Sequence, residues 1–405
     1  MPRYLINLSI LRRNRNFRYL FIGQFISFFG TMITGVALPY QIYMETHSTL
    51  MVGLLSLVQL LPLLFTALAG GVVADRYHRR MLLLISELFL SIGSVLLVIN
   101  AMLPTPSIWM IFVIASLMSA FTGLHRPALE SIVQQVVPKE DYPSVGALST
   151  LKYSVAMIVG PAIGGLLIAK FGLVLTYIVD VATFVISLIS LLMMSHIPKP
   201  QTNTDDSAVS ALIKGFRYAL SRQELIGTYV VDFLAMIFGM PTALFPAIAL
   251  SFGGPEQLGM LYAAPAVGAL FISIFSGWAR NIKRHGVAIA LAASFWGVAI
   301  IGFGLAPNFF SALVFLSIAG AFDAISGLFR AIMWNETIPN HLRGRMAGIE
   351  MISYLSGPKL GDTEAGLVAA AFGVTASVVS GGALCVIGVA ICCFALPKFW
   401  HYKAE

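Results

Sequence analysis

The chain has 405 residues, of which 58% are hydrophobic and only 11% charged, with a formal net charge of +7 and a mean hydropathy of +0.87. A soluble domain carries far more charge, so the composition excludes a water-soluble enzyme or binding module. The positive balance needs no nucleic acid to explain it, because basic loops on the cytoplasmic side of a membrane protein and attraction to an anionic inner leaflet account for it.

Twelve apolar segments fill the sequence, and each is long enough to cross about 30 Å of hydrocarbon as a helix. They predict an all-α membrane protein with twelve transmembrane helices in two pseudo-symmetric six-helix bundles. The boundary between the last two is the least marked, because 366–373 contains no polar break. The predicted spans are 17–44, 50–74, 81–102, 107–134, 146–169, 172–194, 226–251, 256–279, 286–306, 308–334, 346–371 and 373–396.

Lysine and arginine concentrate in alternate loops. They precede the first span and follow the second, fourth, sixth, eighth and tenth, whereas the opposite loops carry only Lys170. By the positive-inside rule both termini are cytoplasmic, in a plasma membrane that we take to be a bacterial inner membrane. Residues 1–16 are then a cytoplasmic segment without the features of a cleaved signal, and 397–405 are a cytoplasmic tail.

One long polar stretch, 195–225, separates an N-terminal bundle at 17–194 from a C-terminal bundle at 226–396. It begins as a Pro/Asn/Thr/Asp linker and continues as an amphipathic helix, which favours a position on the cytoplasmic membrane surface. The halves echo each other, because a Gly-Pro-x-x-Gly motif recurs at corresponding places. Parallel repeats of this kind are typical of one large transporter class, with the substrate site between the halves at mid-depth.

The strongest local signature is GGVVADRYHRR, at 70–80. A glycine lets two helices approach closely. An acid at this place can cap a neighbouring helix N-terminus, and the cations hold the turn in the cytoplasm. The alternative to a functional motif is a basic loop whose charges only set the orientation of the helices in the membrane. The residues of this predicted latch are Gly71, Asp75, Arg76, Arg79 and Arg80.

This segment resembles the signature between helices two and three of the major facilitator superfamily, and the resemblance extends over nearly the whole chain. NLSILRRNRNFR, GVALPYQIYMETHSTLMVGL and GMLYAAPAVGA look most like the enterobactin exporter branch. The resemblance implies a cytoplasmic latch that stabilises the outward-open state, and export of a catecholate-type siderophore by proton antiport. His78 stands where the family usually has glycine, and Asn281 stands where an acid could repeat the latch in the second half.

The Gly-Pro motifs resemble the superfamily's helix-five antiporter motif. Pro161 cannot donate a hydrogen bond to the carbonyl of Met157, so it kinks or loosens the span. We expect either a hinge or plain close packing, in both cases on a face between the two halves. The hinge candidates are Gly160, Pro161, Gly164, Gly165, Gly357 and Pro358.

Ionisable residues inside spans cost about 2.5–3.5 kcal/mol at the helix centre, so they usually face a cavity or a partner. Asp323 and Arg330 share a face, and either a cavity or a buried salt bridge would explain Asp323. Lys152 and Lys359 flank the repeated motif and would suit an anionic substrate. The alternative for Lys359 is an ion pair with Asp362 on its own helix. The predicted cavity residues are Gln24, Lys152, Asp232, Asp323, Arg330 and Lys359.

The first predicted span contains no acid, so a proton carrier must lie elsewhere. The candidates are Asp232, Asp323 and Glu350. Glu87 and Asp180 are weaker ones, because spans three and six usually lie outside the cavity of the resembling fold. Arg126 and Glu130, four residues apart near a helix end, are predicted to form a gate or structural pair.

No catalytic motif is present: the sequence lacks GxxxxGK[ST], HExxH and GxSxG, so neither an enzyme nor ATP-driven transport is predicted. Three cysteines without metal-site spacing predict no metal, and no cofactor is expected. The expected partners are a small-molecule substrate, protons and membrane lipid, with periplasmic or outer-membrane efflux components as candidate proteins. A multidrug or macrolide efflux pump is the nearest alternative function, and a non-transporting membrane sensor or assembly partner is another.

Overall fold

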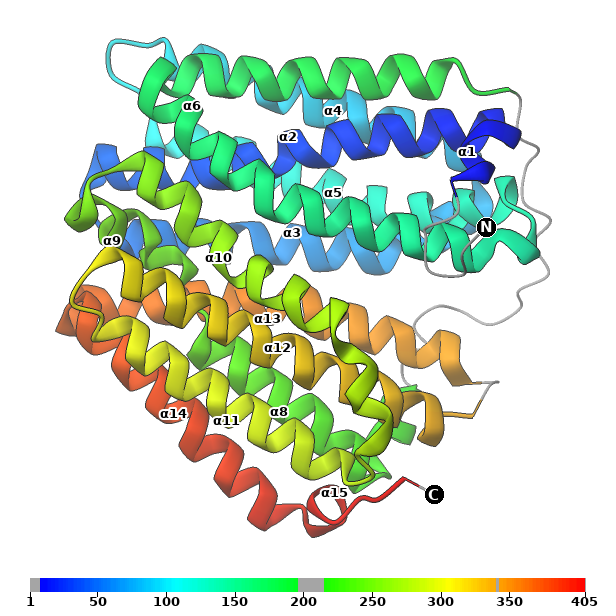
Figure 1. The fold of residues 1–405 in the computed structure, drawn as a ribbon. Coiled ribbons are helices and arrows are strands. Elements are labelled where there is room, and N and C mark those ends of the chain that lie inside the picture. Colours follow the sequence, from blue (N-terminus) through cyan, green and yellow to red (C-terminus); the bar gives the residue numbers. More distant parts are fainter. Residues whose placement is uncertain (1–7, 196–214, 340–341, 405) are drawn as a thin grey trace. The chain divides into compact units, whose positions relative to one another are not determined.

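The computed structural model describes residues 8–195, 215–339 and 342–404, and regular structure within them is entirely helical (Figure 1). The chain divides into two compact units. The first comprises Met1–Gln41 and Leu61–Asp205, and the second comprises Ile42–Leu60 and Asp206–Glu405. Two helices, α2 (Arg15–Thr46) and α3 (Thr49–Arg76), therefore contribute to both units.

The first unit is built from long helices with short connections. The short helix α1 (Ser9–Arg13) precedes α2, and its Ile10 side chain is 1% exposed in a cluster with Phe17, Val137, Val145 and Leu148. The other elements are α4 (Arg79–Ala101), α5 (Ile108–Val136), the 3₁₀ turn η1 (Lys139–Asp141) and α6 (Tyr142–Leu192).

The second unit holds the remaining helices. Residues 215–220 are helical, and the rest of the predicted amphipathic helix lies outside the described residues. The other elements are α8 (Gln223–Gly239), η2 (Thr242–Leu244), α9 (Phe245–Phe252), α10 (Pro255–Ile274), η3 (Ser276–Asn281), α11 (His285–Gly304), α12 (Phe309–Thr337), α13 (Arg343–Phe372), α14 (Val374–Ala395) and α15 (Pro397–Trp400).

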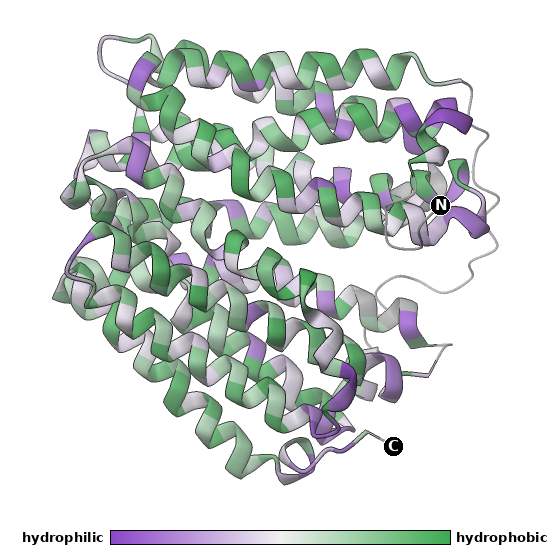
Figure 2. Ribbon diagram, viewed as in Figure 1, coloured by the Kyte–Doolittle hydropathy of each residue, from purple (hydrophilic) through white to green (hydrophobic). Residues whose placement is uncertain are grey.

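Ten segments of the described chain are long and apolar enough to span a membrane. Two features explain why twelve predicted spans give ten such segments. The fifth and sixth predicted spans form one continuous element, α6, and α13 is too polar to qualify because it carries Glu350, Lys359, Asp362 and Glu364. Figure 2 shows hydrophobic residues along most of each helix, with hydrophilic ones gathered near α1 and near α15. The all-helical membrane fold is confirmed.

A single glycine divides α6 into two arms. Gly172 has φ 77° and ψ 178°, a conformation that favours glycine because a Cβ would clash with the backbone. Figure 1 shows the chain turning back on itself between the arms. The helices α13 and α14 are separated in the same way by Gly373, whose φ is 90°. The boundary between the last two predicted spans, which is the least marked in the sequence, is thus made by a glycine, as is the boundary within α6.

The repeated Gly-Pro motifs make close helix contacts inside each unit. A Cβ on Gly160 would lie 2.6 Å from the Cβ of Met32, so the first arm of α6 packs directly on α2. In the second unit, a Cβ on Gly361 would lie 2.2 Å from the carbonyl oxygen of Met236 in α8. The nearest neighbours of both glycines belong to their own unit, and a position of these motifs on a face between the halves stays a prediction.

Candidate functional site

A buried ion pair lies in the second unit. Asp232 on α8 and Arg330 on α12 form a direct salt bridge, and their exposed fractions are 7% and 8%. The Nε of Arg330 is also buried and has no hydrogen-bond partner among the described residues. A buried charge is tolerated where it is paired, so each residue accounts for the presence of the other inside the bundle. The sequence offered a salt bridge of Asp323 only as an alternative, on the ground that it shares a face with Arg330, whereas the observed partner, Asp232, comes from another helix.

Asp323 lies near the middle of α12 but its side chain is exposed. Within the described chain it has no hydrogen bond and no ion pair closer than 4 Å, so the predicted alternative of a buried salt bridge is not observed. A carboxylate at this depth is tolerated where water reaches it. Both the cavity position of Asp323 and its role stay predictions.

A cationic and aromatic group lies in the first unit, on α6, α5 and α2. The Lys152 side chain is buried, and its Nζ lies 4.7 Å from the ring centroid of Tyr153. That ring packs edge-on against Phe28, with centroids 4.9 Å apart. Arg126 is half-buried and acts electrostatically on Lys152, so two positive charges share this region. Such a group can bind an anionic aromatic molecule through charge and ring contacts.

Lys359 forms no direct salt bridge with Asp362, the predicted alternative partner, but the two charges interact electrostatically. Its Nζ donates to Oε1 of Gln59 at 2.5 Å. Asp362 instead accepts hydrogen bonds from the Ser56 hydroxyl at 2.8 Å, from the backbone N–H of Ala243 at 2.8 Å and from the Thr242 hydroxyl. Residues at the start of α3 are therefore fastened to α13 and η2 within the second unit.

The same fastening continues along the two helices. The Thr363 hydroxyl donates to the carbonyl of Gly53 at 3.2 Å, and the Thr49 hydroxyl donates to that of Gly366 at 3.3 Å. A Cβ on Gly366 would lie 2.9 Å from the Cα of Gly53, so the backbones nearly touch. We call this set of contacts, from Thr49 to Gln59 on α3 and from Lys359 to Gly366 on α13, the α3–α13 seal.

Two buried carboxyl groups in the first unit were ranked as weak candidates from the sequence. Glu87 and Asp180 are both 0% exposed. Glu87 on α4 accepts from Gln24 and Ser27, and its Oε1 lies 3.2 Å from Nε2 of His125. Asp180 on α6 accepts from the hydroxyls of Thr34 and Ser94 at 2.7 Å. Gln24, which we expected in a cavity, is 4% exposed, and its amide is occupied by Glu87 and Ser187.

The predicted latch is only partly described. The side chains of Gly71, Asp75 and Arg76 lie outside the described residues. Arg79 donates to the carbonyl of Ser131 at 2.9 Å. Arg80 donates to two carbonyls at the end of α6, those of Leu191 and Leu192, at 2.9 and 2.8 Å. These two arginines therefore hold the start of α4 to α5 and α6 within the first unit, and a latch role stays a prediction.

The remaining predicted residues lie apart from these groups. Glu130 on α5 is exposed, and the prediction that it pairs with Arg126 is not tested by the described contacts. Glu350, near the start of α13, is also exposed. Among the described residues no group of three or more His, Cys, Asp or Glu side chains could hold a metal ion.

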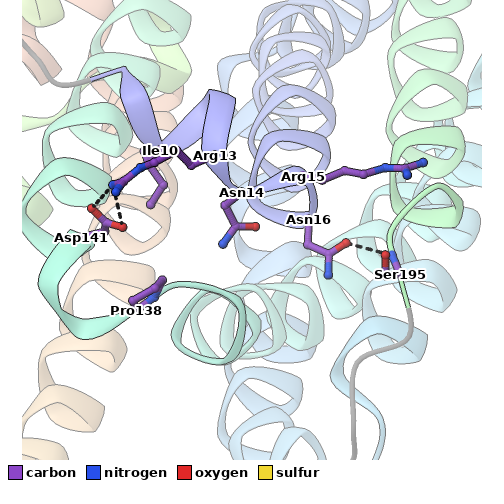
Figure 3. A pocket seen from close by; sticks show the side chains of 8 residues that line it. All are labelled: Ile10, Arg13, Asn14, Arg15, Asn16, Pro138, Asp141 and Ser195. Atoms are coloured by element: carbon purple, nitrogen blue, oxygen red, sulfur yellow. Dashed lines mark hydrogen bonds and ion pairs between the residues drawn. The ribbon is translucent and has the colours of Figure 1, made fainter.

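A polar pocket of about 360 Å³ beside α1 is structural in character. Figure 3 shows the guanidinium of Arg13 directed at Asp141, to which it donates at 2.9 Å. Asn14 donates to the carbonyl of Val136 at 2.6 Å, and Asn16 accepts from the backbone N–H of Ser195 at 2.9 Å. The side chains around this pocket thus join α1 and the start of α2 to the connections that follow α5 and α6.

Residues 8–404 match the model of a protein family described as transmembrane secretion effector, of the major facilitator class. The chain belongs to this family. Its members are transporters and not enzymes, and the match makes the protein a multi-pass membrane transporter of the secondary type. Membership favours transport over the sensor alternative.

Relatives of this secretion effector include two enterobactin exporters. It is 30% identical over 390 residues to the enterobactin exporter of Salmonella typhi, which covers 95% of this chain and 94% of the relative. It is 31% identical over 402 residues to the enterobactin exporter of Escherichia coli strain K12, which covers 99% and 96%. The predicted resemblance to this exporter branch is confirmed.

Solved structures support the fold of this secretion effector. A POT family transporter in complex with 5-aminolevulinic acid has a TM-score of 0.77 at 13% identity and covers 95% of this chain and 97% of its own. The nucleoside transporter NupG has a TM-score of 0.71 at 15% identity and covers 96% and 100%. At such identities the likeness concerns the fold alone, and it confirms the major facilitator architecture.

Proposed function

We propose that the protein exports a catecholate-type siderophore across a bacterial inner membrane by proton-coupled alternating access. The observation that carries the proposal is the full-length similarity to enterobactin exporters in two organisms. Enterobactin-like molecules combine aromatic rings with acidic hydroxyl groups. The Lys152, Arg126, Tyr153 and Phe28 group supports the proposal because it offers cations beside aromatic faces.

The proposal is tested first in cells. Deletion of the gene should lower the secreted catecholates in medium from iron-starved cultures, measured by untargeted metabolite analysis. If secreted chelators are unchanged while resistance to amphiphilic drugs falls, the siderophore assignment is wrong. The drug-efflux alternative has one supporting observation, the exposed carboxylate of Asp323 in the second unit, which would suit a cationic amphiphile.

The substrate group is tested by changing one charge. Lys152→Gln should abolish export of enterobactin while the protein remains folded, and Lys152→Arg should restore part of it because the charge returns. Lys170→Gln is the matched control, since Lys170 lies on the same element, α6, but is exposed. Equal loss in both glutamine variants, or no loss in either, would contradict a substrate role for Lys152.

We infer that the α3–α13 seal opens and closes during each transport cycle. Its contacts are hydrogen bonds and glycine packing, which can be exchanged for water more readily than a buried ion pair. A disulfide between cysteines placed at Gly53 and Gly366 should stop export, and reduction should restore it. Continued export by the oxidised protein would contradict a moving seal.

The latch and the orientation are proposed from the sequence. Asp75→Asn should leave the protein folded and slow its flux, because a helix N-terminus loses its anionic cap. Both termini are proposed to be cytoplasmic, and a reporter fused at the C-terminus that is active only in the cytoplasm checks this. Activity only on the opposite side would contradict the orientation.

Of the three carboxylates predicted for proton coupling, Asp323 fits best within the second unit. Asp232 is held as a charged partner by Arg330, whereas Asp323 is exposed and has no ion-pair partner among the described residues. Asp323→Asn should therefore weaken coupling more than Glu350→Gln. The reverse order in a transport assay driven by a pH gradient would remove Asp323 from the proposal.

A further inference from the structure

Glu87 is surrounded on all sides by hydrogen-bonding groups of the first unit. Its Oε1 lies 2.7 Å from Nε2 of Gln24 and 3.2 Å from Nε2 of His125. The hydroxyl of Ser27 lies 3.3 Å from each of its two oxygens. Two helices therefore supply partners to this carboxyl group on α4. The amide and the hydroxyl come from α2, and the imidazole comes from α5.

The described partners of Glu87 include no lysine or arginine. An isolated carboxylate is very costly to bury, and an amide and a hydroxyl cannot compensate for its whole charge. The charge is balanced only if a proton is present, either on the carboxyl group itself or on the imidazole of His125. The pair is neutral overall in both arrangements, and it becomes charged when the proton leaves.

The other groups facing this pair strengthen the need for that proton. From α6, the fully buried Asp180 interacts electrostatically with Glu87, and the two are groups of like charge when ionised. Gln24 and Ser27 from α2 and Ser187 from α6 are uncharged. On α5, the residue after His125 is Arg126, which belongs to the proposed substrate group. A second negative charge near Glu87 therefore makes the unprotonated pair less favourable.

His125 and Glu87 differ in their exposure to solvent. The side chain of His125 is 16% exposed and that of Glu87 is 0% exposed. A proton can thus arrive from water at the imidazole and move inward along the 3.2 Å contact. In that step the Nε2–H bond of the imidazolium breaks and an O–H bond forms on Oε1 of Glu87. The imidazolium becomes neutral imidazole and the carboxylate becomes a carboxylic acid.

We propose that His125 and Glu87 form a proton-binding site that couples transport to the proton gradient. The inference rests on the proposed function in one respect, the coupling of export to protons. It adds a site in the first unit to the carboxylates of the second. Because His125 and Arg126 are neighbours on α5, the proposed proton site lies next to the proposed substrate group.

The first test uses full-length protein reconstituted in liposomes, with enterobactin as the probe. Two assays are compared: accumulation driven by a pH gradient, and exchange of internal for external enterobactin without a gradient. Glu87→Gln and His125→Gln should lose the driven accumulation but keep the exchange, because exchange needs no net proton movement. Ser187→Ala, which removes one neutral hydrogen bond from Gln24, should behave like the wild type in both assays.

The second test needs no substrate. Infrared spectra of the purified protein are compared as the pH changes, and the wild type should show a protonated-carboxyl band that Glu87→Gln lacks. The pH at which that band changes should move in His125→Gln. Thermal unfolding of each variant checks that the fold is retained. The glutamine at position 87 keeps an oxygen for Gln24 and Ser27.

The outcomes separate this inference from the proposed function. If the wild type moves no enterobactin but the infrared band depends on Glu87 and His125, the substrate proposal fails and the proton site stands. If both glutamine variants accumulate enterobactin as the wild type does, or their pH-dependent spectra equal that of the wild type, the inference is overturned.

Discussion

The two units keep acidic side chains inside a membrane protein in different ways. In the second unit Asp232 is neutralised by a direct ion pair with Arg330. In the first unit Glu87 and Asp180 are fully buried and are held by hydroxyls, an amide and an imidazole. A fixed cation keeps its partner ionised, whereas the described partners of Glu87 and Asp180 include no lysine or arginine. The comparison therefore separates a direct charge pair from two buried carboxyl groups that lack such a partner.

The largest effect is expected from removing the cation of the second unit. Arg330→Ala leaves Asp232 as an uncompensated buried charge, which should cost about 3–5 kcal/mol of stability. Adding Asp232→Asn to that variant should recover a large part of the loss. Thermal or denaturant unfolding in detergent measures both. If the double variant is as unstable as the sum of the two single variants, the two charges are not coupled.

A smaller effect is expected at Asp362, which is held by hydroxyl and backbone donors. Ser56→Ala removes one hydrogen bond to a charged acceptor and should cost about 1.5–3 kcal/mol. The same measurement applies, and Ser251→Ala is a suitable control because Ser251 is exposed and its hydroxyl donates only to the local carbonyl of Ile248. An equal effect of the two changes would show that the α3–α13 seal adds no stability at this contact.

The stability of the protein should be nearly unchanged when the carboxyl group of Asp180 is replaced by an amide. Asp180→Asn keeps an acceptor for Thr34 and Ser94, so stability should change by about 1 kcal/mol or less. Asp180→Ala should cost more, because two buried hydroxyls lose their acceptor. A loss in Asp180→Asn as large as that in Arg330→Ala would break the distinction between the units.

The smallest effect is expected at the surface pair shown in Figure 3. The Arg13 side chain is 64% exposed, so Asp141→Asn should change stability by only about 0.2–1 kcal/mol, and less at high salt. Unfolding at low and high ionic strength checks this. A loss of several kcal/mol would mean that the pocket beside α1 does more than join helix ends.

The fold could be predicted from the sequence because its signals are local. Apolar length, alternating basic loops and the latch signature each lie within one segment, and they led to the major facilitator architecture. The partners of buried charges could not be predicted in the same way. Arg330 contacts Asp232 and not Asp323, because the partner depends on how α8 and α12 are rotated about their axes.

The same limit explains why the surroundings of Glu87 could not be predicted. Nothing in its own segment shows that Gln24, Ser27 and His125 meet around it, since they lie on two other helices. Two signals were available in the sequence. Gln24 and Ser27 are three residues apart, which predicts that they share one face of a helix. His125 lies within a predicted span, where a polar side chain needs a partner. Asp323, by contrast, lies near the middle of α12 as its sequence position indicated, and it is exposed there.

The single-residue turn at Gly172 has a mechanical consequence. The arm of α6 before it carries Lys152 and the arm after it carries Asp180, and no loop lies between them to absorb strain. Under the proposed function, a tilt of the first arm when substrate binds at Lys152 would be transmitted to the second arm and to the buried carboxyl group of Asp180. Lengthening this turn with a few flexible residues would uncouple the two arms while leaving each with its own neighbours.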